Sequence, residues 1–492
     1  MLNKWLKSLA SSLFVFLPII EMLRNTKFKD IELFNVALIE LVLIVLILTM
    51  VALTIYKHKY HFSKILFFIA IVYCVYLFLH CFHIYSFDTV IFPLNKPSYF
   101  VELYYLFRVY LLPLLLIFVL LENKDVFDKQ FYLSISKYLI VVICGNIVFC
   151  NLFRFSLFSY KYENEALINN STFFDVFNVT KDYKELFSCG FFPSANQISI
   201  VLVMLLPLNL LSLYRKVSIV NTLLVVLQLF AMIIVGTKTA VLGSILELVS
   251  GLVMYIGFAI LPKQQSLKGN YLIVLICLMI LTTCTIYISP FYKNYSSEQN
   301  DLSVLTEKQK YIYKQLESLP IESATSFIKS NYSTFKINKM FIDYYPIEND
   351  PVFWINIAKR DRSLNNDYRI IKQDILARIV QRNDNTFDRY FGLGYSINFP
   401  DIERDYVYQY YLFGIFGVIL FIGSYIIIYL YNLYKAFYKA NFNYYYALPL
   451  VSCLFGLVVC YFSGHLFGWS FPMYILAMCL CYQREDDYCD KG

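Results

Sequence analysis

The sequence predicts an all-α integral membrane protein with about 12 transmembrane helices and a large extracytoplasmic loop domain. Of its 492 residues 59% are hydrophobic and only 16% are charged, whereas about a quarter of the residues in a soluble domain are charged. Apolar runs long enough to cross a hydrocarbon core of about 30 Å recur along the chain. Backbone amides in lipid need partners within the protein, so such runs indicate helices, and the alternating segments of a β-barrel are not seen.

The apolar runs place the spans in order along the chain. They are expected near 5–23, 31–56, 64–85, 100–121, 137–158, 196–214, 218–236, 239–260, 270–290, 406–432, 445–463 and 465–483. The chain then divides into a membrane bundle over 1–290 with an outer polar loop over 159–195, a large extracytoplasmic loop over 291–405, and a second part of the bundle with a cytoplasmic tail over 406–492.

Basic residues in the short loops predict the orientation. With the N-terminus inside, the inner segments carry twice as many Lys and Arg residues as the outer ones, so both termini are expected in the cytoplasm. The first outer loop is the exception, because it carries Arg24, Lys27 and Lys29. The first span could therefore be re-entrant instead of fully transmembrane.

Charge and cysteine usage limit the function classes. The net charge of +7 is typical of the cytoplasmic ends of membrane helices and does not indicate nucleic-acid binding. Most of the 12 cysteines lie inside apolar runs, and no CxxC or CxxH spacing occurs. We expect them to be packing residues, and we expect no metal and no cofactor.

The polar segment 291–405 is too long to be a simple connection between spans. Its length favours chemistry or recognition on the outer face. Within it, 368–383 places Ile371, Ile375 and Ile379 four residues apart, which predicts an amphipathic helix.

Charged groups at membrane depth are candidates for function. Arg108 lies a third of the way into the fourth span, where a lone charge usually faces a cavity or a partner, although it could also extend to the interface. Lys238 follows Gly236 in a tight outer turn, GTKTAVLG, and could be an ordinary interfacial lysine. Glu40 and Glu247 also lie within spans, and each is expected to pair with a basic neighbour.

The entry to the sixth span has a capping signal. In CGFFPSANQISIVLVMLLPL, Ser194 or Asn196 can cap the helix, which would leave amide donors facing the outer surface. Such a terminus suits an anion.

The end of the long loop and the start of the tenth span hold the densest set of candidates. A basic amphipathic helix is followed by glycine pairs and an acidic cluster: Gly392, Gly394, Asp401, Glu403, Asp405, Gly414 and Gly417. The GLG turn is not a phosphate loop, because no strand precedes it and no Lys-Ser or Lys-Thr follows. The charges could also be a solvated loop face, and Glu403 could simply pair with Arg404 or a loop arginine.

Four blocks in this order resemble the O-antigen ligase and polymerase superfamily, in particular members from Gram-positive surface-polysaccharide clusters. The first two are FPSANQISIVLVMLLPL and GTKTAVLG, which in the family has a basic turn residue. The third is an arginine before a Gly-x-Gly turn, here Arg369, and the fourth is a polar residue before paired glycines, here Glu403. SGHLFGWSFPMYILAM is similar to the family's last helices.

The resemblance implies a membrane-embedded C-type glycosyltransferase that takes an undecaprenyl-diphosphate-linked oligosaccharide as donor. Glu403, Arg369 and Asp405 would be catalytic, with Glu403 as the base that activates the acceptor. The diphosphate would be bound by further residues: Lys238, Arg108, Arg362 and Asn196. The implied partners are this donor, a glycan acceptor and membrane lipid, with a chain-length regulator and a flippase as further candidates.

The chain departs from the ligases at two positions. It has Glu403 where they have histidine, and Lys238 where arginine is common. The acidic block IERD looks like the Gram-positive variant, which implies a bacterial, Gram-positive cell membrane and argues against a lipid A core acceptor.

Three functions follow from these features. A polymerase that joins repeat units of a capsule, exopolysaccharide or teichuronic-acid-like chain is favoured, and a ligase that transfers a finished glycan is its close relative. A lipid-linked oligosaccharide flippase is the alternative from another class, but flippases tend to show two related halves and no large outer domain.

The predicted orientation can be tested by labelling. In a cysteine-free background, Met340→Cys should react with an impermeant thiol reagent in intact cells, because the long loop is expected outside. Tyr438→Cys should react only after permeabilisation. The reverse pattern would contradict both the orientation and outer-face chemistry.

Overall fold

The computed structural model is almost entirely helical in the part it describes. That part comprises residues 1–23, 27–28, 31–32, 36–58, 64–85, 98–153, 175, 187–260, 268–287, 289–293, 295–296, 306–366, 368–397, 399, 402–438 and 442–482. The predicted outer loop 159–195 lies mostly outside these residues. Two compact units form: unit 1 comprises Met1–Phe62, Phe107–Asn294 and Ser424–Gly492, and unit 2 comprises Ser63–Leu106 and Tyr295–Gly423.

The described residues include nine helices long and apolar enough to cross a membrane: Leu2–Leu23, Glu40–His58, Tyr99–Glu122, Lys129–Leu152, Ala195–Arg215, Lys238–Ile260, Gly269–Lys293, Asp405–Tyr438 and Tyr444–Phe462. Three shorter apolar stretches, Ala70–Ile84, Ile219–Val235 and Ser470–Tyr482, lie where the other predicted spans fall. A helical integral membrane protein is therefore confirmed, and the count of 12 spans stays a prediction.

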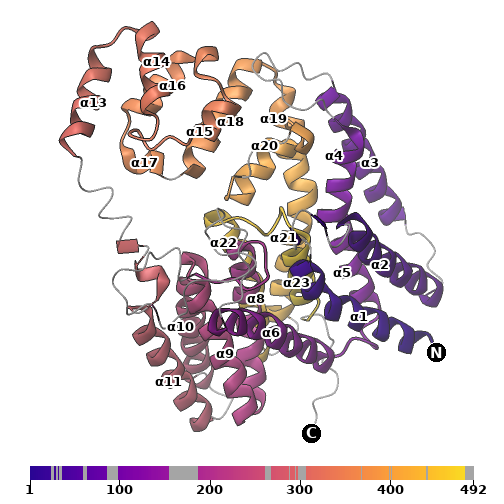
Figure 1. Ribbon diagram of the computed structural model, residues 1–492. Helices are drawn as coiled ribbons and strands as arrows, with labels where there is room; N and C mark the ends of the chain where they lie inside the picture. Colours follow the sequence, from indigo (N-terminus) through magenta and orange to yellow (C-terminus); the bar gives the residue numbers. More distant parts are fainter. Residues whose placement is uncertain are drawn as a thin grey trace. The chain divides into compact units, whose positions relative to one another are not determined.

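Unit 1 is a helical bundle built around one buried helix. Its helices are α1 (Leu2–Leu23), α2 (Val36–His58), α5 (Leu112–Glu122), α6 (Lys129–Leu152), α8 (Ala195–Arg215), α9 (Ile219–Val235), α10 (Lys238–Ile260), α11 (Gly269–Ile286), α21 (Gly423–Tyr438), α22 (Tyr444–Phe462) and α23 (Ser470–Tyr482). A π-helical turn, η1 (Phe107–Leu111), precedes α5, and a two-residue ladder pairs β1 (Lys27–Phe28) with β2 (Ile31–Glu32). The helix α8 packs against α6, α9, α10, α22 and α23 and is buried along its length (Figure 1).

Proline interrupts this central helix. Pro207 lies inside α8 and has no amide to donate to the preceding turn. Neighbouring carbonyls of α8 receive side-chain hydrogen bonds from other helices: Gln228 of α9 donates to the Leu202 carbonyl at 2.9 Å, and Ser452 of α22 donates to that of Met204. Pro207 removes the helical bond to the Val203 carbonyl, and the packing of α9 and α22 adds hydrogen bonds to the carbonyls on either side of it.

Several span limits differ from the predicted ones, and local structure explains two of these differences. The helix α6 starts at Lys129 instead of 137, because the Asp128 carboxylate accepts from the Phe131 amide at 2.8 Å and caps a polar first turn. The last helix starts at Ser470 instead of 465, because Gly464 and His465 adopt positive φ in the preceding turn.

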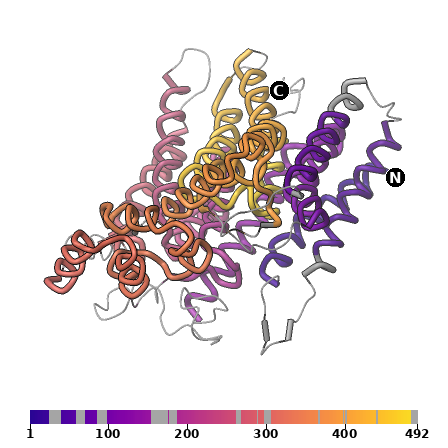
Figure 2. The backbone as a smooth tube through the Cα atoms, turned by 90° about the horizontal axis from the view of Figure 1, so that it is seen from above, coloured from indigo at the N-terminus to yellow at the C-terminus, as the bar shows by residue number. Residues whose placement is uncertain are grey.

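Unit 2 joins two helices from the first half of the chain to the long loop and the start of the tenth span. Its helices are α3 (Lys64–Tyr85), α4 (Tyr99–Leu106), α13 (Glu307–Ser318), α14 (Ile321–Asn331), α15 (Lys339–Tyr344), α16 (Pro351–Lys359), α17 (Arg362–Asn366), α18 (Tyr368–Asn383), α19 (Phe387–Phe391) and α20 (Asp405–Gly417). Short turns η3 (Ile347–Asn349), η4 (Tyr395–Ile397) and η5 (Val418–Ile422) complete it. Figure 2 shows α13 to α18 following one another from red to orange.

The predicted amphipathic helix is confirmed with its limits. It is α18, and Ile371, Ile375 and Ile379 are all buried. Trp354 of α16 is also fully buried, so the polar stretch of the long loop contains helices that pack with buried apolar side chains.

Asp350 connects the start of α16 to α18 through hydrogen bonds. Its carboxylate accepts hydrogen bonds from Arg378 Nε at 2.6 Å, from Tyr345 Oη at 2.9 Å and from the Phe353 amide at the start of α16. Burial acts to raise the pKa of Asp350, but the hydrogen bonds from Arg378 and Tyr345 prevail and lower it.

Asp350→Asn should destabilise the α13–α18 region by about 2–4 kcal/mol, because it breaks a charged, buried network. Trp354 fluorescence in a variant with Trp5 and Trp469 replaced by Phe would report its unfolding. Because the pKa of Asp350 is lowered in the folded protein, the stabilisation is present at neutral pH and is lost as the pH falls through that pKa.

Glu348→Gln is the control, because it breaks an exposed pair with Lys329 and should change stability by less than about 1 kcal/mol. Equal effects of the two variants would contradict a special role for Asp350.

Candidate functional site

The Gly-x-Gly turn packs directly against the backbone of α20. Gly414 has φ 66° and ψ −176°, which breaks α20 into two helical pieces. The Leu393 and Gly394 amides donate to the Tyr411 and Leu412 carbonyls, each at 2.8 Å. A Cβ atom on Gly392 would lie 2.2 Å from the Leu412 carbonyl oxygen, so only glycine allows this approach.

Arg369 and Glu403, 34 residues apart in sequence, form an ion pair in unit 2. Glu403 Oε2 accepts from Arg369 Nη2 at 2.6 Å and from Nε at 3.2 Å. Arg369 lies in the first turn of α18, and Glu403 lies just before α20. Both side chains keep about a third of their surface exposed, at 30% and 35%, so the pair is accessible to a ligand.

The other predicted residues of unit 2 lie in different surroundings. Asp405 starts α20 and is 1% exposed, so it does not share the exposed environment of Glu403. Arg362 of α17 is buried near Tyr313, and its Nε and Nη1 have no hydrogen-bond partner among the described residues. The predicted roles of both stay predictions.

A buried polar network holds the Gly-x-Gly turn from its other side. His80 of α3 contacts the Phe391 carbonyl through Nδ1 at 2.6 Å and Glu102 Oε1 through Nε2 at 2.9 Å. Glu102 of α4 also accepts from the Tyr395 and Ser396 amides, each at 2.9 Å. His80 and Glu102 are both 0% exposed.

A second histidine of α3 makes an equivalent contact. His83 Nε2 lies 2.8 Å from Asp388 Oδ1, and Asn383 donates to Oδ2 of the same carboxylate at 3.0 Å. None of these groups stands out in the sequence as a candidate. The only local signal was the spacing of His80 and His83, which places both on one helical face.

In unit 1 the first two family-like blocks meet. Ser194 caps α8 by accepting from the Gln197 amide, as predicted, and Ser199 of α8 bonds to Thr237 at 2.6 Å between their hydroxyls. Thr237 in turn caps α10, which begins at Lys238, an exposed residue. Asn196 lies half-buried in the first turn of α8. Phosphate binding by Asn196 and Lys238 stays a prediction.

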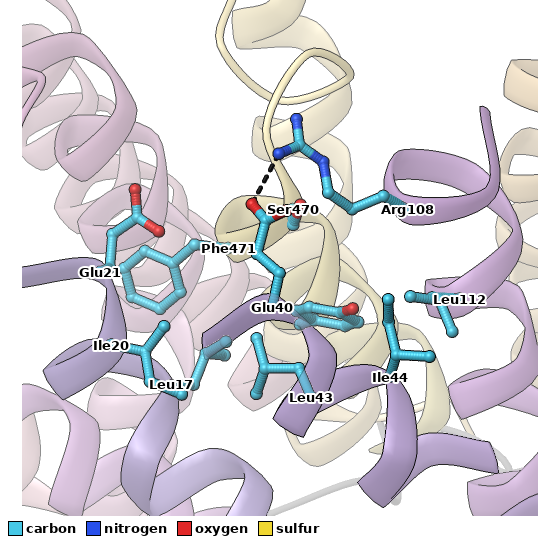
Figure 3. A pocket seen from close by; sticks show the side chains of 11 residues that line it. Leu17, Ile20, Glu21, Glu40, Leu43, Ile44, Arg108, Leu112, Ser470 and Phe471 are labelled. Carbon is cyan, nitrogen blue, oxygen red and sulfur yellow. Dashed lines mark hydrogen bonds and ion pairs between the residues drawn. The ribbon is translucent and has the colours of Figure 1, made fainter. Parts of the chain in front are cut away.

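Arg108 lines a pocket at membrane depth in unit 1. It lies in the π-helical turn η1, and its Nη1 donates to Glu40 Oε1 at 2.6 Å, so the predicted partner of Glu40 is confirmed. Figure 3 shows this pair at the polar end of the pocket, with Glu21 nearby and Leu17, Ile20 and Ile44 at the apolar end. Because Arg108 already has a carboxylate partner, its binding of a diphosphate stays a prediction.

Glu247 differs from its prediction. It lies in α10 and is 1% exposed, and neither carboxylate oxygen has a hydrogen-bond partner among the described residues. The prediction of a basic neighbour for Glu247 is wrong, because Glu247 faces the apolar interior of the bundle.

The accessible chemistry of unit 2 is thus a guanidinium beside a carboxylate. Arginine can grip a phosphate through two parallel N–H groups, and a carboxylate can accept a proton. Within the described ranges no cluster of three or more His, Cys, Asp or Glu residues could hold a metal ion.

Comparison with known proteins identifies the family of the chain. Neither the curated proteins nor the solved structures gave a match to the chain. A family model, O-antigen ligase like membrane protein, matches residues 3–482, which is nearly the whole chain. The chain therefore belongs to the O-antigen ligase-like membrane protein family.

Proposed function

We propose that the protein is a polymerase that joins undecaprenyl-diphosphate-linked oligosaccharide repeat units into a cell-surface polysaccharide. Membership of the family supports the coarser statement that it is a membrane glycan-processing enzyme. The observation that carries the finer proposal is the accessible ion pair between Arg369 and Glu403.

The reaction needs two groups with the properties of this pair. The acceptor hydroxyl attacks the anomeric carbon of the donor, and the bond from that carbon to the diphosphate oxygen breaks. The electron pair leaves with the diphosphate, where Arg369 stabilises the developing charge. The hydroxyl proton passes to the Glu403 carboxylate, so atoms and charge balance.

In the structure the side chains of Arg369 and Glu403 contact each other. Nε and Nη2 of Arg369, which both donate to Glu403 Oε2, form the edge that would grip a phosphate. A diphosphate that binds this edge competes with Glu403. Binding of the donor would therefore release the carboxylate close to the reacting bond.

A ligase would share this half-reaction and differ only in its acceptor. The product separates the two: purified protein and lipid-linked repeat units alone should give a ladder of lengthening chains if the protein is a polymerase. Transfer only to a different added acceptor would favour the ligase.

Arg369→Ala should reduce polymer formation by about 100- to 1000-fold, because it removes a donor to the leaving group. Arg369→Lys should restore it partly, since lysine keeps the charge but loses the fork. Gel analysis of the polymer measures both, and membrane yield controls for insertion. Normal polymer from Arg369→Ala would overturn the proposed site.

Glu403→Gln should lose turnover by about 100- to 10,000-fold, because the base is removed. It should nevertheless bind inorganic pyrophosphate about two- to fivefold more tightly, because Arg369 loses its competing carboxylate. Calorimetry with the purified protein measures this binding.

Asp374→Asn is the matched control for that binding experiment. Asp374 is on the same helix as Arg369, is 35% exposed like Glu403, and pairs with Arg360 at 2.5 Å. The variant removes the same charge without freeing Arg369. Equal tightening in both variants would mean that general electrostatics, and not the ion pair, controls the binding.

A further inference from the structure

The short connector between α18 and α20 is held by the helices α3 and α4. The name connector is used for α19 and the turn through Ser396. This segment lies in sequence between the helix that carries Arg369 and the helix preceded by Glu403. Figure 1 shows α19 and α20 beside α3 and α4, and the contacts within unit 2 agree.

Both ends of α19 are fixed by histidines of α3. His83 contacts Asp388 in the first turn of α19, and His80 contacts the carbonyl of Phe391, its last residue. The two histidines lie three residues apart, so one face of α3 fixes both the position and the rotation of α19.

Hydrogen-bond roles show how Glu102 fixes the turn. The Phe391 carbonyl can only accept, so Nδ1 of His80 carries a hydrogen, and the Tyr395 and Ser396 amides can only donate to Glu102. One further proton then lies between His80 Nε2 and Glu102 Oε1. Every polar atom of the two side chains is used, and both are buried away from solvent.

The other side of the turn is paired with α20 through the Tyr411 and Leu412 carbonyls. The turn therefore fixes α20 relative to α4. In the same way, α19 fixes the end of α18 relative to α3. The relative placement of α18 and α20 determines whether Arg369 and Glu403 can meet.

We propose that Glu102, with His80, His83 and Asp388, is a positioning residue for the Arg369–Glu403 pair, which it sets through the connector without touching substrate. This rests on the proposed function for its consequence in catalysis. Its geometric content is independent of that function.

The test uses Glu102→Gln in the full-length protein. The Tyr395 and Ser396 amides donate to different oxygens of Glu102, and one of these becomes an NH2 group that cannot accept, so the turn should loosen. Nitroxide labels on Ala377 of α18 and Ile415 of α20, both exposed, would measure the distance between the two helices in a cysteine-free background. We expect one narrow distance in the parent and a broadened distribution in the variant.

Kinetics give the second measurement. With lipid-linked repeat units, kcat of Glu102→Gln should fall about 100-fold while KM changes less than about threefold, because misplacement affects the chemical step. Glu247→Gln is the matched control, since it makes the same substitution at a buried glutamate in an apolar helix. It should keep the parent distance and kcat.

The outcomes separate the two proposals. An unchanged narrow distance in Glu102→Gln overturns the positioning role whatever the activity, whereas normal turnover of Arg369→Ala overturns the proposed function and leaves the distance result standing. If Glu102→Gln does not fold, Asp388→Asn is measured in the same way. It should also broaden the distribution, and a parent-like distribution would overturn the proposal.

Discussion

The break of α20 at Gly414 is the constraint on which the site of unit 2 depends. A positive φ there ends the regular helical ladder, so the carbonyls of Tyr411 and Leu412 need other donors. The amides of Leu393 and Gly394 supply them. Unpaired backbone groups are costly in an apolar environment, and the turn and the helix therefore stabilise each other. The turn follows α18, which carries Arg369, and Glu403 lies directly before α20. The junction therefore lies close in sequence to both residues of the ion pair.

Local patterns in the sequence predicted much of this. Periodic isoleucines gave the limits of α18, because the burial of a helical face is a local property that spacing reports directly. Capping by Ser194 was predictable for the same reason. Arg369 and Glu403 were both named as candidates, and pairing of Glu403 with a loop arginine was an open alternative. The sequence could not single out Arg369 as that arginine, since a pair 34 residues apart leaves no periodic signal.

The residues that sequence reasoning missed are those with distant partners. Glu102 meets amides nearly 300 residues later in the chain, and His83 meets Asp388 across a similar separation. Among the buried carboxylates, only the environment of Glu40 was predicted, since a basic partner was expected there and is found. Glu40, Glu102 and Glu247 all lie in apolar helices, yet one pairs with an arginine, one gathers a histidine and two amides, and one has no described partner. Only the tertiary packing distinguishes them.

The contact between α8 and α22 has a consequence for how the protein is made. Ser452 of α22 donates to the Met204 carbonyl and follows Met204 by 248 residues. A ribosome that has just delivered α8 to the membrane has therefore not yet synthesised one of the helices that cover it. The bundle around α8 consequently closes late, and truncations before Ser452 leave α8 without the packing of α22.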